Sequence, residues 1–247
     1  MENNPTESIR TNLLGTKIIA DLAVAYNIQK FILVSTDKAV NPTNVMGASK
    51  RSAEMYCQAL NQEHKTKFII TRFGNVLGSN GSVIPLFKKQ INGGGPITVT
   101  HPNVTRFFMT IKESCQLVLE ASSMGDGGEI FVFDMGESIK IIDLAHKMIQ
   151  LAGLEIDKDI KIKIIGLRPG EKMFEETLNI SESTSKTHHP KILIGKVSLV
   201  NLSEINKSIE KLIMFIKTQQ NDEIIKEMKE IIPEFISNNS EFSKFDN

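Results

Sequence analysis

The chain has 247 residues, 40% of them hydrophobic and 23% charged, a composition that excludes wholesale disorder and allows one large domain or two small ones. Lys and Arg number 29, as do Asp and Glu, so the overall charge does not indicate nucleic acid as the partner. The chain has two cysteines, no apolar run long enough to span a membrane and no signal-peptide pattern at its start, so we expect a cytoplasmic protein.

The first part of the chain alternates between helical and extended patterns. Asn4 and Pro5 are typical of a helix start, and the helix that follows would bury an apolar stripe that includes Ile18, Ile19 and Leu22. Because the connections between the expected strands are too long for hairpins, these strands should be parallel. In chain order we expect a helix over 5–25, a strand buried on both faces over 31–34, a helix over 45–63 and a strand over 68–73.

Beyond Gly74 the sequence is richer in glycine and loops, and the whole pattern predicts an α/β fold. A parallel sheet that opens with a helix lacks the strand that should precede it. Neither G-x-G-x-x-G nor G-x-x-x-x-G-K-[ST] is present to bind a phosphate. The further elements expected are strands over 97–100, 130–133 and 161–165, helices over 111–122 and 138–151, and two amphipathic helices from about residue 201, with the last ten residues frayed.

The densest group of reactive side chains directly follows the first predicted strand. Ser35, Thr36, Asp37 and Lys38 combine hydroxyl, carboxylate and amine groups, and Lys50 lies on the next helix. Open α/β sheets bind ligands at the carboxyl ends of their strands, where such groups can donate and accept protons. The spacing alone slightly favours the other interpretation, a solvated turn with an Asp–Lys surface pair.

Three segments resemble the bacterial nucleotide-sugar 4,6-dehydratases of polysaccharide biosynthesis, a branch of the extended short-chain dehydrogenase/reductases. They are STDKAVNPTNVMGASKR at 35–51, TRFGNVLGSNGSVIPLF at 71–87 and GLRPGEKMFEE at 166–176. The resemblance implies a partial Rossmann-type parallel sheet, the C-terminal half of that fold, with a small α/β substrate-binding region and C-terminal helices. It divides the chain into a core over 1–180 and a C-terminal helical extension over 181–247.

In the family that the chain resembles, NAD takes a hydride from C4 of the hexose, water is eliminated across C5 and C6, and the hydride returns to C6. The resemblance implies that Asp37 is the general acid at C6 and Lys38 the general base at C5. Thr36 would bind near the C4 oxygen. Met46 replaces the tyrosine that takes the C4 hydroxyl proton in most of the superfamily, and a thioether cannot do so. That proton would go to Asp37, Lys38 or water.

The same resemblance implies the binding residues. For the cofactor, NAD with NADP as the alternative, the implied contacts are Asn12, Ser35, Lys50 and Phe73. Lys88 could equally be a solvated helix charge, and 168–171 a plain turn. No metal is expected, because the histidines are scattered and no CxxC spacing exists. The implied contacts for a UDP-sugar substrate are Asn75, Ser82, Val83, Pro85, Lys88, Arg106, Arg168 and Glu171.

Full-length members of this family begin with a glycine-rich NAD-binding unit, and membrane-anchored members carry transmembrane helices before it. We therefore expect a truncated chain with an unpaired edge at strand 31–34, little NAD binding and little activity by itself. An N-terminal half on a separate chain would be a partner, and intact members would form homo-oligomers. The alternatives are a nucleotide-sugar 4-epimerase and a non-catalytic remnant or binding module.

Overall fold

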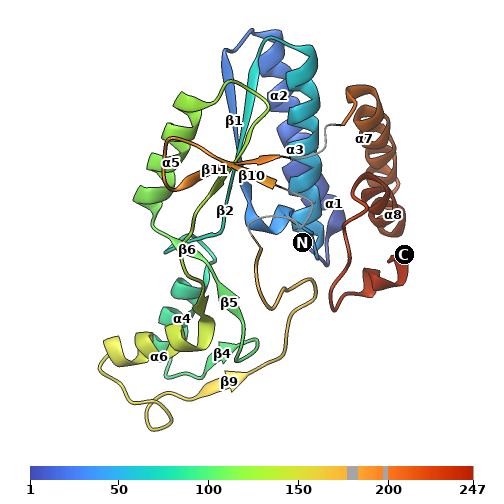
Figure 1. The fold of residues 1–247 in the computed structure, drawn as a ribbon. Coiled ribbons are helices and arrows are strands. Elements are labelled where there is room, and N and C mark those ends of the chain that lie inside the picture. Colours follow the sequence, from blue (N-terminus) through green and yellow to red (C-terminus); the bar gives the residue numbers. More distant parts are fainter. Residues whose placement is uncertain (177–182, 197–199, 247) are drawn as a thin grey trace.

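The computed structural model describes residues 1–176, 183–196 and 200–246. Its main body is a five-stranded sheet in the order β1-β2-β7-β11-β10 (Figure 1). The strands β1, β2 and β7 are parallel, with Phe31 opposite Phe68 and Thr36 opposite Phe73, and β11 is antiparallel to both β7 and β10. Their bounds are β1 Lys30–Thr36, β2 Lys67–Phe73, β7 Ile130–Phe133, β10 Ser183–Lys186 and β11 Ile192–Lys196.

Helices cover both faces of this sheet, and the alternation of side chains along the strands explains why. In β7, Ile130 and Val132 belong to one apolar core, whereas Phe131 and Phe133 belong to another. The helix α5 (Ile111–Met124) packs on the second core through Leu117 and Ala121. The first core is covered by α1 (Pro5–Ser8), the π-helical η1 (Ile9–Leu14), α2 (Gly15–Ala25), α3 (Val45–Glu63), α7 (Leu202–Lys217) and α8 (Asn221–Ile231).

A smaller lobe lies beyond the carboxyl ends of β1 and β2 (Figure 1). It has its own apolar core, which includes Phe87, Ile97 and Ile149. Its larger elements are α4 (Val83–Asn92), β4 (Ile97–Val99), α6 (Ile141–Leu151) and β9 (Ile162–Ile164). Two short strand pairs connect it to the sheet, β3 (Asn75–Val76) with β6 (Phe108–Met109) and β5 (Thr105–Arg106) with β8 (Ile139–Lys140). The expected α/β fold is confirmed.

Several expectations are wrong in detail. The apolar stripe predicted for the first helix is buried only in part: Ile9 and Leu13 are buried, but Ile18 and Ile19 are 60% and 59% exposed and Leu22 is 49% exposed. Strand β1 is not buried on both faces, because Val34 is 48% exposed. The periodicity of an amphipathic helix identifies an apolar face but does not say whether the described chain covers it.

The C-terminal part also differs from a purely helical, frayed extension. Residues 183–196 add β10 and β11 to the main sheet. The last residues form a 3₁₀ turn, η3 (Glu241–Phe245), in which Phe242 is buried. Its burial stabilises the end of the chain, because a buried phenylalanine contributes about 1.5–3 kcal/mol. Among the described helices, none combines the length and the apolar character needed to cross a lipid bilayer.

Candidate active site

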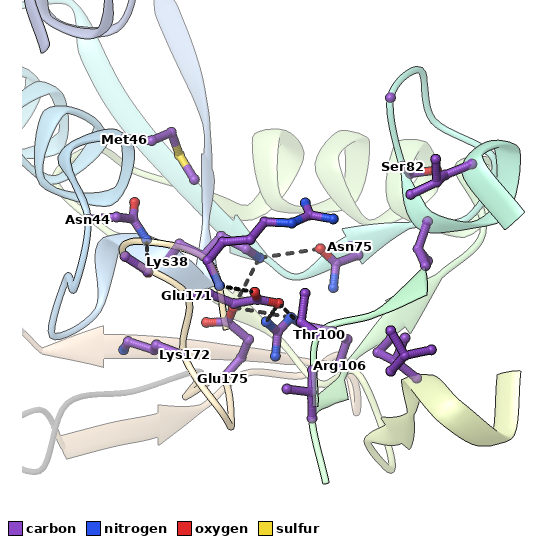
Figure 2. Close-up of a pocket in the computed structure, with 18 of the residues that line it drawn as sticks. Lys38, Asn44, Met46, Asn75, Ser82, Thr100, Arg106, Glu171, Lys172 and Glu175 are labelled. Atoms are coloured by element: carbon purple, nitrogen blue, oxygen red, sulfur yellow. Dashed lines mark hydrogen bonds and ion pairs between the residues drawn. The ribbon is translucent and has the colours of Figure 1, made fainter. Parts of the chain in front are cut away.

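A pocket of about 410 Å³ lies where the carboxyl ends of β1 and β2 face the smaller lobe (Figure 2). Its wall combines residues that follow these strands with the first turns of α3 and α4 and the turn at 168–171. Eight of the sequence-predicted residues line it: Lys38, Met46, Asn75, Ser82, Val83, Arg106, Arg168 and Glu171.

Asp37 and Lys38 follow β1 in a short 3₁₀ turn, η2 (Asp37–Ala39), which Thr36 caps by accepting a hydrogen bond from the Lys38 amide. Lys38 Nζ contacts Asp37 Oδ1 at 2.8 Å, and Thr36 Oγ1 donates to the same oxygen at 2.9 Å. The other Asp37 oxygen, Oδ2, is buried and has no hydrogen-bond partner among the described residues. A buried polar atom without a partner is costly, which is typical of a site that a ligand completes.

Helix α3 packs directly against this turn. Asn44 caps it by accepting a hydrogen bond from Gly47 N at 2.8 Å. A β-carbon at Gly47 would lie 2.1 Å from the Lys38 carbonyl oxygen, so only glycine allows the helix to approach so closely. Met46 therefore reaches the pocket beside Lys38, at the position where the superfamily tyrosine is expected.

Asn75, at the start of β3, holds the Lys38 side chain from the other side. Its Oδ1 accepts from Lys38 Nζ at 3.3 Å (Figure 2), and its Nδ2 donates to the Phe107 carbonyl at 3.1 Å. Both ends of the amide are thus occupied, and the oxygen is directed at the lysine. In this structure Asn75 orients Lys38, a contact that the sequence did not indicate.

Glu175 is the pocket residue that sequence reasoning missed. Its carboxylate is 3% exposed, and Oε1 lies 3.7 Å from Lys38 Nζ and 3.5 Å from Arg106 Nε. Burial, together with the negative charge of Asp37, raises the pKa of Glu175, although the positive charges of Lys38 and Arg106 oppose the shift. The sequence did contain a signal for Glu175, since this residue belongs to the segment 166–176 that carries the family resemblance and lies four residues after Glu171.

The turn at 168–171 forms the opposite wall. Glu171 Oε1 accepts from Thr100 Oγ1 at 2.9 Å and from Arg106 Nη2 at 3.2 Å, and Oε2 accepts from the Arg168 amide at 3.0 Å. Arg106 is therefore shared between Glu171 and Glu175. The planar guanidinium fork suits this arrangement and also suits phosphate oxygens.

The residues predicted to bind the cofactor are not part of the pocket lining. Lys50 Nζ donates to the Val34 carbonyl at 2.8 Å, and burial lowers the pKa of this lysine despite the nearby Glu54. Asn12 lies in the π-helical η1 and donates to Ser49 Oγ at 2.9 Å. Ser35 is buried and Phe73 half-buried at the ends of β1 and β2.

Two predicted substrate residues do not reach the pocket. Pro85 and Lys88 are exposed on α4 and are not part of the lining, whereas Ser82 and Val83 line it at the start of that helix. Lys88 also makes no side-chain hydrogen bond or ion pair to the described residues. The ranges 1–176, 183–196 and 200–246 contain no cluster of three His, Cys, Asp or Glu residues that could hold a metal ion.

Comparison with known proteins shows where this architecture occurs. A family model described as "Polysaccharide biosynthesis protein" matches residues 1–197. The capsular polysaccharide biosynthesis protein CapD of Staphylococcus aureus is 54% identical over 214 residues, which are 86% of this chain and 36% of CapD. The chain therefore spans about a third of the length of that relative.

Two further relatives are named as enzymes. A UDP-N-acetylglucosamine 4,6-dehydratase (inverting) of Campylobacter jejuni is 38% identical, covering 74% of this chain and 53% of that protein. A UDP-glucose 4-epimerase of Rickettsia bellii is 42% identical, covering 72% and 52% respectively.

Solved structures share the fold. The structure of Pen from Bacillus thuringiensis superimposes with a TM-score of 0.72 at 34% identity, covering 85% of this chain and 70% of that one. At 20% identity, a dTDP-glucose 4,6-dehydratase of Streptomyces venezuelae with NAD bound has a TM-score of 0.61 and covers 68% and 56% of the two chains.

Proposed function

The chain belongs to the polysaccharide biosynthesis protein family, and on this premise we propose that it carries the sugar-binding and acid–base half of a UDP-N-acetylglucosamine 4,6-dehydratase. The pocket would hold the UDP-sugar, and the product would be a UDP-4-keto-6-deoxy sugar. The relative of that name in Campylobacter jejuni supports this substrate class. The observation that carries the proposal is the contact of Asp37 and Lys38 at the end of β1.

This contact supplies an acid and a base together. Moving one proton across the 2.8 Å from the Lys38 ammonium to the Asp37 carboxylate leaves a neutral amine and a carboxylic acid. The amine removes the proton at C5, the acid protonates the hydroxyl at C6, and the C6–O bond breaks to release water as the C5–C6 double bond forms. Removing the C5 proton requires a ketone at C4 and a base within hydrogen-bond reach.

The other pocket residues would hold the substrate in place. Arg106 and Arg168 provide guanidinium groups for the diphosphate oxygens, and Ser82 and Val83 would border the nucleotide at the start of α4. Thr36 lies beside Asp37 and would bind near the C4 oxygen. Met46 has no proton-accepting group, so the proton of the C4 hydroxyl would go to Asp37, Lys38 or a water molecule.

The cofactor residues present in this chain fit the nicotinamide end of NAD. Lys50 places its amine at the carboxyl end of β1, where it would hold the nicotinamide ribose, with Ser35 and Phe73 nearby at the strand ends. No glycine-rich loop in this sequence offers backbone amides to the pyrophosphate. Bound NAD would supply the oxidation at C4 and the reduction at C6.

We therefore propose a partner unit that supplies the rest of the NAD site, a glycine-rich βαβ unit on a longer form of the chain or on a separate one. Within the described residues β1 pairs only with β2, so its other edge offers unpaired backbone groups. Val34 and the α2 residues Ile18 and Ile19 expose apolar surface on this part of the molecule. Exposed sheet edges and apolar patches are typical docking surfaces.

A 4-epimerase is the second candidate, favoured by the Rickettsia bellii relative. Epimerisation needs oxidation and reduction at C4 alone and no acid or base at C5 and C6. The Asp37–Lys38 pair therefore favours the dehydratase. The two activities differ in product, because a dehydratase gives a 4-keto-6-deoxy sugar and an epimerase gives the C4 epimer with its C6 hydroxyl intact.

Lys38→Ala tests the proposal. The chain is first titrated with UDP and with UDP-N-acetylglucosamine by isothermal calorimetry. Turnover is then measured after addition of the part of the Staphylococcus aureus relative that this chain does not match. We expect Lys38→Ala to lower turnover at least about a hundredfold, as loss of a general base does, while UDP still binds.

Lys89→Ala is the matched control, because Lys89 is exposed on α4 and its side chain makes no hydrogen bond or ion pair to the described residues. It should leave both binding and turnover unchanged. Near-normal turnover of Lys38→Ala, or a chain that binds neither UDP nor the UDP-sugar, would refute the proposed function.

A further inference from the structure

The residues after α8 contact two segments of the chain that border the pocket, 42–43 and 167–170. Four hydrogen bonds attach the C-terminal segment 236–239 to two distant parts of the chain. Ile236 N donates to the Pro42 carbonyl at 3.2 Å, and Asn238 N donates to the Thr43 carbonyl at 3.1 Å. Gly170 N donates to the Asn238 carbonyl at 2.6 Å, and Asn239 Nδ2 donates to the Leu167 carbonyl at 2.9 Å.

The two parts that this segment joins are also bonded to each other. Thr43 Oγ1 and Asn44 Nδ2 both donate to the Gly170 carbonyl, at 3.0 and 2.9 Å. Gly170 has a φ of +76°, and a β-carbon there would lie 2.4 Å from Asn44 Cβ, so the turn fits tightly against the residue that caps α3. The segment 236–239 completes this joint from the outer side.

The joint controls the position of pocket residues that the segment itself does not touch. None of residues 236–239 lines the pocket, but Asn44, Arg168, Gly170 and Glu171 do. Glu171 in turn accepts from Arg106 at 3.2 Å, so a shift of the turn at 168–171 would move both arginines offered to the substrate. Through such a series of hydrogen bonds, one segment can hold in place residues that it does not contact directly.

The segment is itself firmly anchored. Lys229, 9% exposed, donates to the Phe235 carbonyl at 3.1 Å and to Ser237 Oγ at 2.9 Å, forms an ion pair with Asp246, and lies 4.0 Å above the Phe235 ring. Phe235 is 2% exposed in the main apolar core. The segment is therefore held on one side by Lys229 of α8 and by the buried Phe235, and on the other side it contacts the turn at 168–171.

We infer that the C-terminal segment 236–239 is a positioning element of the nucleotide-sugar pocket, which fixes the turn at 168–171 so that affinity for the UDP portion depends on it. This inference rests on the proposed function. It assigns a role in substrate binding to residues outside the range 1–197 that the family model matches.

Two shortened chains test the inference, one ending at Phe235 and one ending at Ser240. Both lose η3 and Asp246, and only the first also loses the segment. UDP affinity is measured by isothermal calorimetry well below the unfolding temperature of each chain, so that a loss of stability alone does not change it. We expect UDP to bind the chain ending at Phe235 about tenfold more weakly, a difference of ~1.4 kcal/mol, and the chain ending at Ser240 within about twofold of the full chain.

A point variant keeps the test decisive if the shorter chain does not fold. Asn239→Ala removes the hydrogen bond to Leu167 and should weaken UDP binding about threefold, at the level of one hydrogen bond. Asn206→Ala, on α7 and without a side-chain hydrogen bond to the described residues, should change nothing. Equal UDP affinity in both shortened chains, or in Asn239→Ala and the full chain, would overturn the inference, whereas a full chain that does not bind UDP would refute the proposed function as well.

Discussion

Glu175 changes the balance of charge around the acid–base pair. Asp37 and Glu175 both contact the Lys38 ammonium, and Arg106 contacts Glu175 from the other side. One oxygen of each carboxylate is buried and has no hydrogen-bond partner in the part of the chain that the structure describes. Two carboxylates that share one cation interact strongly, so the proton affinity of one depends on the charge of the other.

The raised pKa of Glu175 has a consequence for stability. The folded chain holds the proton of this carboxyl more tightly than the unfolded chain, whose value is near 4.5. Glu175 therefore contributes stability that is present at low pH and is lost as pH rises from 4.5 through the raised value. Glu175→Gln should remove this contribution to the pH dependence of the free energy of unfolding.

Urea unfolding at several pH values between about 4.5 and 8 measures this effect as the difference in slope between the two proteins. Glu137→Gln serves as the control, since Glu137 is exposed and its side chain makes no hydrogen bond or ion pair to the described residues. Parallel curves for the full chain and Glu175→Gln would contradict the assignment of the raised pKa.

At the scale of elements, α3 connects the site to the core. Its polar residues Arg51 and Glu54 are buried, and Glu54 accepts from Arg72 of β2 at 2.9 and 2.6 Å and from Arg51 at 3.2 Å. Burial alone would raise the pKa of Glu54, but the charges of Arg72 and Arg51 outweigh it and hold that pKa below its ordinary value. This network fixes the helix that carries Met46 and Lys50 to the strand that leads to Asn75.

Glu54→Gln should destabilise the fold by about 3–5 kcal/mol, because it removes the negative charge that two buried guanidinium groups contact. The free energy of unfolding in urea near neutral pH measures it. Glu63→Gln, at the exposed end of the same helix, should change stability by less than about 0.5 kcal/mol. A loss below about 1 kcal/mol in Glu54→Gln would mean that packing alone holds α3 on β2.

At the scale of the molecule, the proposed binding of the UDP-sugar and the proposed binding of NAD depend on different residues. The residues proposed to bind the UDP-sugar lie in β3, β5, the start of α4 and the turn at 168–171, all within the described chain. Lys50, which would hold the nicotinamide ribose, is not part of this pocket lining and donates to the Val34 carbonyl. The chain matches about a third of the CapD protein, and its β1 edge offers a place for a further strand.

We therefore expect the chain alone to bind UDP but to bind NAD⁺ only at millimolar concentration or more weakly. The physical reason is that nicotinamide-side contacts alone, without amides on the pyrophosphate, leave most of the dinucleotide's charge unpaired. Isothermal calorimetry with both ligands on one sample tests this, with UDP as the internal control. Micromolar affinity for NAD⁺ would contradict it.

The local patterns of the sequence determined several elements closely, although they did not indicate β10 or β11. The helix expected over 45–63 and the strand over 130–133 have the bounds found for α3 and β7, because periodicity and capping act over a few neighbouring residues. Parallel topology then placed Asp37 and Lys38 at the carboxyl edge of the sheet, so the acid–amine pair could be found without coordinates.

Tertiary structure alone decided which distant groups meet. Glu175 beside Lys38, Asn75 turned toward the same amine, and the segment 236–239 across the turn at 168–171 join parts of the chain that no local pattern relates. The exposure of Ile18 and Val34 was decided in the same way. A sequence pattern records which face of an element is apolar, whereas the packing of whole layers determines which residues from elsewhere come to lie against it.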